Sequence, residues 1–250
     1  MMKKKYSIKI WAIIFWLCFW HMTSLIIGKE ILIVSPVKVI ERLGQLVMEA
    51  EFWKSICFTF FRILLGFLSA SIAGILLAAL SANFLIIREL IYPMISVIKS
   101  IPVASFIILA LVWFPSRNLS IFISFLIVLP VIYTNVLRGI QETDKQLLEM
   151  IKIFGIPKKF TIKYLYIFQV MPFFQSGCEI ALGLCWKSGI AAEVIGMPDG
   201  SIGEKLQQAK IYLDTKDLFA WTFVIVIISL FFEKSFLSLL KKINIYFERM

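Results

Sequence analysis

A polar stretch between two long apolar runs reads EMIKIFGIPKKF, residues 149–160. A short helix is expected to end at Gly155, because glycine adopts a positive φ without a Cβ penalty. A second helix is expected to begin at Pro157, because proline suits the first helical turn. Apolar residues spaced by three or four predict that the first helix packs one face against the rest of the protein: Ile140, Leu147, Leu148, Ile151 and Phe154. The stretch therefore predicts a rigid helical elbow, which indicates a docking site for a second protein; the alternative is an interfacial hairpin without a partner.

The composition is that of a membrane protein. Hydrophobic residues make up 60% of the 250 residues, 23 of them Phe, and the mean hydropathy is +0.89. One soluble core cannot bury so much apolar surface. Since a span needs about 20 mostly apolar residues, six spans are expected, at roughly 8–27, 57–82, 91–113, 119–136, 172–195 and 218–240. The expected fold class is an all-α integral membrane protein.

The basic residues predict which side of the membrane each loop occupies. The start Met1-Met2-Lys3-Lys4-Lys5 resembles a signal peptide, but the apolar run after it is too long and no small-x-small cleavage pattern follows, so a retained helix is expected. Roughly 14 basic residues fall on the amino-terminal side of the spans and roughly 8 on the other. We therefore expect a multi-pass plasma-membrane protein with both termini and the elbow in the cytoplasm.

Several classes of function find no support in the sequence. The formal net charge is +10, but the basic residues are dispersed along the span flanks, so membrane lipid is the expected partner and nucleic acid is not. The four cysteines form no C-x-x-C pair and His21 is the single histidine, so no metal site is expected and the cysteines are expected to be packing residues. No P-loop, nucleophile elbow or carboxylate pair is present. An enzyme, a catalytic residue and a cofactor are therefore not expected.

The elbow resembles the cytoplasmic loop of ABC importer permeases, which carries Glu-Ala-Ala, three residues and Gly. Glu149-Met150-Ile151 and Gly155 match its spacing, with both alanines replaced. The first proline of that loop would fall at Phe168 and is missing, whereas Pro172 fits a second proline common in the nitrate, taurine and alkanesulfonate branch. Further positions fit that branch in order, so that the likeness covers roughly 55–240: Arg62, Gly66, Ile101-Pro102-x-Ala104, Trp113-Phe114, Gly177, Ala181, Leu182, Gly183, Trp186, Ala192 and Glu193.

The resemblance implies the transmembrane subunit of an ATP-driven importer. Residues 1–54 would form an N-terminal span and outer connection, 55–240 the permease domain with its coupling loop at about 138–169, and 241–250 a cytoplasmic tail. Cytoplasmic ABC ATPase subunits would press on the coupling loop, at Glu149, Met150, Ile151, Gly155, Pro157 and Lys158. An extracytoplasmic solute-binding protein would deliver the solute, arriving at the polar outer loop 196–217, whose alternative interpretation is a plain surface helix. A second permease subunit, expected to be an identical copy, would complete the path.

Charged residues inside spans are costly and so indicate a translocation path. The candidates are Lys99, Ser100, Pro102, Lys187 and Glu193, and the two lysines favour a small anion. The alternative for Lys99 is that it reaches the cytoplasmic surface, and the alternative for Lys187 is that it pairs with Glu179 or Glu193. Glu193 has two alternatives, closing an outer gate or contacting a docked receptor. Two lines of small residues predict close helix packing. The first line packs either within one subunit or between subunits: Gly66, Ala70, Gly74 and Ala78. The resemblance places the second line near the path and the two-fold axis: Gly177, Ala181, Cys185 and Gly189.

Two rival functions remain from the sequence alone. An ion-gradient-driven secondary transporter would be expected to show inverted repeats and midplane acidic residues, of which the spans hold few apart from Glu179 and Glu193. A non-transporting scaffold would use the elbow only to recruit a soluble protein. The substrates of the branch are nitrate, taurine, sulfonates and thiamine-related pyrimidines. Lys99 and Lys187 do not identify which of these this protein transports.

Overall fold

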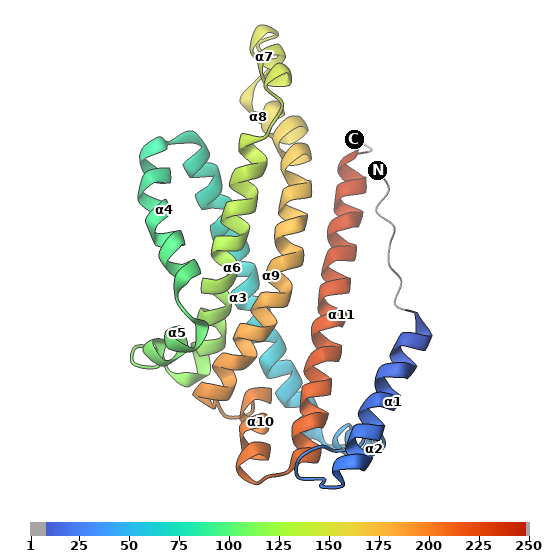
Figure 1. Ribbon diagram of the computed structural model, residues 1–250. Coiled ribbons are helices and arrows are strands. Elements are labelled where there is room, and N and C mark those ends of the chain that lie inside the picture. The colour runs from blue at the N-terminus through green and yellow to red at the C-terminus, as the bar shows by residue number, and fades with distance from the viewer. Residues whose placement is uncertain (1–8, 249–250) are drawn as a thin grey trace.

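The computed structural model describes residues 9–248 as a bundle of helices, shown in Figure 1. The basic start at residues 3–5 lies outside the described residues. The elements in chain order are α1 (Ile10–Ile27), α2 (Pro36–Leu46), α3 (Ala50–Asn83), α4 (Leu85–Ser100), α5 (Val103–Ala110), α6 (Ser116–Gln141), α7 (Lys145–Ile153), α8 (Lys158–Thr161), the π-helix η1 (Ile162–Tyr166), α9 (Ile167–Gly196), α10 (Ile202–Ile211) and α11 (Thr215–Glu248). The all-α membrane fold is confirmed.

The long apolar helices agree with most of the expected spans. Within residues 9–248, four helices are long and apolar enough to cross a membrane, namely α1, α3, α6 and α11. The bent pair α4 and α5 makes a fifth if it counts as one span. The remaining expected span, 172–195, falls within α9, where three charged residues interrupt the apolar sequence. In Figure 1, α9 runs alongside α6 through the bundle.

The expected span 91–113 is not continuous, which corrects the sequence prediction. The axes of α4 and α5 meet at an angle of 103°, and Ile101 between them is extended, with φ −80° and ψ 131°. The cause is Pro102, because a proline disfavours the helical conformation of the residue before it. The bend leaves α5 lying across the end of the bundle opposite α7 (Figure 1).

The core consists of α3, α6 and α9, which approach one another through glycines. A Cβ at Gly66 would lie 2.6 Å from the carbonyl oxygen of Ile121, and one at Gly189 would lie 2.8 Å from Ser124 Oγ. All members of both small-residue lines are buried within this one chain. For the line in α3 this confirms packing inside one subunit. The line in α9 also packs inside the chain, so a different face of α9 is left uncovered.

Two segments outside the expected spans are also helical. The outer connection after α1 contains the helix α2, which Ser35 and Pro36 begin with proline at the first helical turn. The tail expected from residue 241 continues α11 as far as Glu248.

Of the cysteines, Cys178 and Cys185 are buried as expected, but Cys18 and Cys57 are exposed on the surface of the chain.

Candidate coupling loop and translocation face

The elbow forms as a helix, a left-handed glycine and a second short helix. Asp144 caps α7, its side chain accepting the N–H of Gln146 at 2.8 Å, and the side-chain oxygen of Gln169 accepts the N–H of Asp144 at 2.9 Å. Pro157 directly precedes α8 as its N-cap, one position earlier than expected. A π-helix then joins α8 to α9, and such segments often mark functional positions.

Gly155 ends α7 in the conformation that the sequence predicts. Its φ is +64°; its N–H donates to the carbonyl of Lys152 at 3.2 Å, and the N–H of Ile156 donates to that of Ile151 at 3.1 Å. These two bonds are those of a Schellman motif, which satisfies carbonyls that a helix end otherwise leaves unpaired. A Cβ at position 155 would meet no heavy atom within 4 Å, so the glycine is required by its backbone conformation and not by crowding.

Most apolar side chains of α7 are exposed, contrary to the expected packing, although Leu148 and Ile151 of the expected stripe are partly buried. None of its residues is buried, Ile153 is 81% exposed and Phe154 is 74% exposed. Met150 and Leu147 are also exposed. Figure 1 shows α7 and α8 projecting beyond the ends of the long helices. An exposed apolar patch of this kind, rimmed by Lys152 and Glu149, is typical of a protein–protein contact.

Lys99 lies at the far end of α4 from the elbow. Its ammonium group donates to the hydroxyl of Thr134 in α6 at 2.9 Å, and Ser100 and Pro102 beside it are exposed. Fourteen residues separate Lys99 from the start of α4 at Leu85, a rise of about 21 Å at 1.5 Å per residue. The ammonium group itself lies level with Thr134, seven residues or about 10 Å from the elbow end of α6 at Gln141. The position of Lys99 therefore agrees with both of its interpretations, lining a path and reaching towards the elbow-side surface.

Lys187 lies on an exposed face of α9 that also carries Glu179. Both side chains are exposed, as are Ile180 and Leu184 between them, whereas the neighbours Cys185, Trp186 and Ser188 are buried. Among the described residues Lys187 takes part in no salt bridge. The expected alternative of a structural pair with Glu179 or Glu193 therefore has no counterpart in the structure. One side of α9 packs on α6 while the other presents charge outwards.

Glu193 is placed in the interior and not on that face. It is fully buried, and its Oε2 accepts the hydroxyl of Thr59 at 2.7 Å and the N–H of Gly203 at 3.4 Å. Its Oε1 and the hydroxyl of Ser120 are buried and have no hydrogen-bond partner among residues 9–248. The sequence singled out Glu193 but not Thr59 or Gly203. The Ser201-x-x-Glu204 spacing of a capping box marked the start of α10 and could have located Gly203 in its first turn, but not Thr59 in α3.

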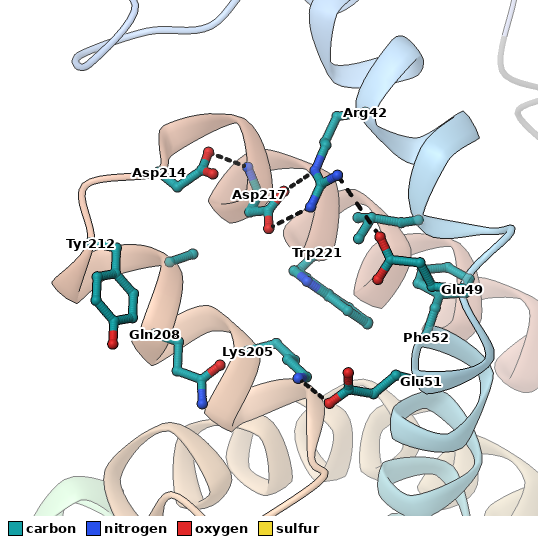
Figure 2. A pocket seen from close by; sticks show the side chains of 12 residues that line it. Arg42, Glu49, Glu51, Phe52, Lys205, Gln208, Tyr212, Asp214, Asp217 and Trp221 are labelled. Atoms are coloured by element: carbon teal, nitrogen blue, oxygen red, sulfur yellow. Dashed lines mark hydrogen bonds and ion pairs between the residues drawn. The ribbon is translucent and has the colours of Figure 1, made fainter.

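A polar cavity of about 350 Å³ lies at the same end of the bundle as α10. Figure 2 shows its charged groups paired across helices: the guanidinium of Arg42 in α2 donates to both oxygens of Asp217 in α11, and Lys205 in α10 pairs with Glu51 in α3. Asp217 raises the pKa of Arg42 above its usual value, mainly through the hydrogen bond. These pairs hold the ends of four helices together.

Comparison with known proteins identifies the class of this membrane protein. Residues 70–243 match the family described as the binding-protein-dependent transport system inner membrane component. A probable ABC transporter permease protein of Brucella melitensis is 27% identical over 80% of this chain and 81% of its own length. The taurine transport system permease protein TauC of Escherichia coli is 22% identical over 90% and 84%, and the nitrate import permease protein NrtB of Synechococcus elongatus is 25% identical over 75% and 70%. The chain belongs to the family of inner-membrane components of binding-protein-dependent transport systems, and it is the permease subunit of an ABC importer.

Proposed function

We propose that two copies of this chain enclose the translocation path between their α9 faces, and that the path carries a small anion. The observation that carries the proposal is the exposure of Lys187 and Glu179 on α9, a helix inside the bundle. Ionisable residues within membrane helices almost always face a bundle interior or a water-filled cavity. A second subunit that covers this face would provide such a cavity. The chain itself is a candidate because a homo-oligomer with two-fold symmetry is the commonest assembly.

Lys99 would lie at one end of this path and Lys187 deeper within it. Lys99 already bonds to Thr134 on the adjoining helix α6, and Ser100 and Pro102 at the α4–α5 bend add exposed backbone nearby. The relatives named for taurine and nitrate transport have anionic groups in their solutes. Two lysines against Glu179 leave a net positive face, which supports an anion. Glu193, being buried, is not part of this proposed path.

The elbow at α7 is the proposed docking site of the ATPase. Family membership implies an ATPase and a binding protein as partners. The exposed apolar side chains of α7, with Gly155 fixing the turn, supply the surface that such a partner would cover. With α7 in the cytoplasm, as the basic-residue bias predicts, α10 and the polar cavity would face outwards, where the binding protein arrives. None of the residues of α1 is buried in the chain, and its exposed apolar side chains would contact lipid.

The water-filled path is tested by the reactivity of single cysteines. In a background without the native cysteines, K187C should react with a small charged thiol reagent, whereas I227C on the exposed side of α11 should not, because that side faces lipid. Two differently tagged copies of the chain should co-purify when no other permease is expressed. Equal protection of both cysteines would contradict the path, and failure of the tagged copies to associate would contradict the homodimer.

A further inference from the structure

A buried carboxyl group joins three helices at the end of the bundle opposite the elbow. The hydroxyl of Thr59 in α3 donates to Glu193 Oε2 in α9 at 2.7 Å and accepts the N–H of Ile202 in α10 at 3.0 Å. The N–H of Gly203 donates to the same carboxylate oxygen at 3.4 Å. Thr59, Glu193 and Ile202 are all fully buried. The contact is thus shielded from the water that weakens exposed polar contacts.

The start of α10 depends on these side chains. The first N–H groups of a helix have no partner within it, and here Thr59 accepts that of Ile202 and Glu193 that of Gly203. The hydroxyl of Ser201 accepts the N–H of Glu204 at 3.0 Å. A carboxylate at this end is also favoured by the helix dipole. Two of the three bonds therefore come from other helices, which fixes α10 to α3 and α9.

The packing at Gly203 leaves no slack between α10 and α9. A Cβ at this position would lie 2.3 Å from the Cβ of Glu193 and 2.4 Å from its carbonyl carbon. A second side-chain link between α10 and α3 is the ion pair of Lys205 with Glu51, in which the Lys205 side chain is 20% exposed and the Glu51 side chain is 65% exposed. Exposed ion pairs contribute little to holding helices in place. The buried contact at Glu193 is accordingly the firm attachment of α10.

We infer that Glu193 is a positioning residue of the transport cycle, which with Thr59 makes α10 and α9 move as one body. Contact of the binding protein with α10 then displaces α9, the helix that carries Lys187. This inference rests on the proposed function, in which α10 faces outwards and α9 lines the path. Glu193 acts here through hydrogen bonds inside the chain and has no contact with the solute.

The first test removes the shared hydroxyl and restores it. T59V deletes both bonds of Thr59 in a side chain of similar shape, and T59S keeps the hydroxyl. The matched control is S55A, because Ser55 lies one turn earlier in α3, is equally buried and has no hydrogen-bond partner in the part of the chain that the structure describes. Permease–ATPase complexes are reconstituted in liposomes with the cognate binding protein loaded with taurine, an alkanesulfonate or nitrate. We expect T59V to keep its basal ATP hydrolysis and to lose most of the stimulation by the binding protein, at least tenfold, while T59S and S55A resemble the unmodified protein.

A second pair of variants separates hydrogen bonding from charge. In E193Q the amide oxygen can accept the same two bonds and the amide nitrogen can donate towards Ser120, so stimulation and solute preference should be unchanged. E193L has a similar volume without either acceptor and should lose stimulation as T59V does. An altered solute preference in E193Q with normal stimulation would place the carboxylate in the path and overturn the inference. Normal stimulation in T59V or E193L would overturn it as well.

A third measurement does not depend on transport. A spin label at the exposed position Lys210 at the end of α10, in a background without the native cysteines, should become more mobile in T59V and E193L but not in T59S or S55A. Increased mobility with intact stimulation would refute the role in transport while leaving the contact itself established. If the unmodified protein responds to no binding protein, the proposed orientation fails, and the label still reports whether Glu193 holds α10. Unchanged mobility in both variants would overturn the inference directly.

Discussion

Replacement of Gly155 tests whether the shape of the elbow is what an ATPase recognises. The residue has a φ of +64°, and a Cβ added to it would meet no atom within 4 Å. The cost of a side chain therefore comes from the left-handed backbone alone, about 1–2 kcal/mol for an ordinary L-residue. Asparagine tolerates this conformation, alanine bears the ordinary cost, and β-branched valine is a genuine outlier there.

The series G155N, G155A and G155V should therefore weaken ATPase docking in that order. If docking requires the Schellman turn, a penalty of 1–2 kcal/mol lowers the population of the competent elbow, and so the apparent affinity, by about 5- to 30-fold. G155N should stay close to the unmodified protein and G155V should fall at or beyond the upper end. The spans are not touched by these changes, so membrane abundance should remain normal.

The assay is titration of the purified ATPase onto each variant in detergent or nanodiscs, with abundance measured by immunoblot. Exposed apolar residues such as Ile153 and Phe154 stay in place in every variant, so a loss of affinity reports the turn and not the contact side chains. Equal affinity for G155V and G155N would refute the reasoning, because the two differ in how well they accept a positive φ. A loss that tracks reduced abundance would refute it too.

Three further outcomes follow from the same geometry. Single cysteines at Lys158 and Asp199 should label from opposite sides of the membrane, and labelling of position 158 by an impermeant reagent in intact cells would reverse the orientation. K187Q should lower uptake severalfold at normal membrane abundance and with the ATPase still stimulated; since Lys187 makes no salt bridge among the described residues, a fall in abundance would contradict the path-lining role. G66V should reduce the amount of the protein in the membrane, because its Cβ would lie 2.6 Å from a carbonyl oxygen and overpacking costs roughly 1–3 kcal/mol. The control is G183A, where a Cβ meets nothing within 4 Å, and this variant should reach the membrane in normal amounts.

The sequence predicted the features that local chemistry determines. Apolar runs located the long helices, and Gly155 with Pro157 located the elbow, because backbone conformation there depends on the residue itself. The break at Pro102 carried an equally local signal, but it was outweighed by the apolar run on both sides of it. The start of α2 was marked in the same way by Ser35 and Pro36.

The features that the sequence did not predict depend on distant residues. Glu193 occurs in an apolar span, and its sequence position alone does not show which residues it contacts. Only the approach of Thr59 and Gly203 in the fold shows its internal hydrogen bonds. The direction of the α7 face was also undetermined, since its periodicity is the same whether it packs on the bundle or on a partner. Likewise, both the small residues and the charged residues of α9 follow helical spacing. Only the packing of α9 on α6 shows that the small residues are buried and that Glu179 and Lys187 are exposed.

The continuity of α9 gives these separate sites a mechanical relation. The helix has 30 residues, a length of about 45 Å at 1.5 Å per residue. The π-helix η1 joins it to the elbow at one end, and Glu193 fixes it to α10 at the other. Lys187 lies between the two attachments on the exposed face. Because the helix is attached at both ends, we expect a push on α7 and a contact on α10 both to reposition Lys187. Pro172, which interrupts the backbone hydrogen bonding inside α9, lies between the elbow and Lys187. Breaking either attachment should therefore abolish uptake. G155V should do so with loss of ATPase docking, and T59V, which acts at the opposite end of the helix, should do so with docking intact.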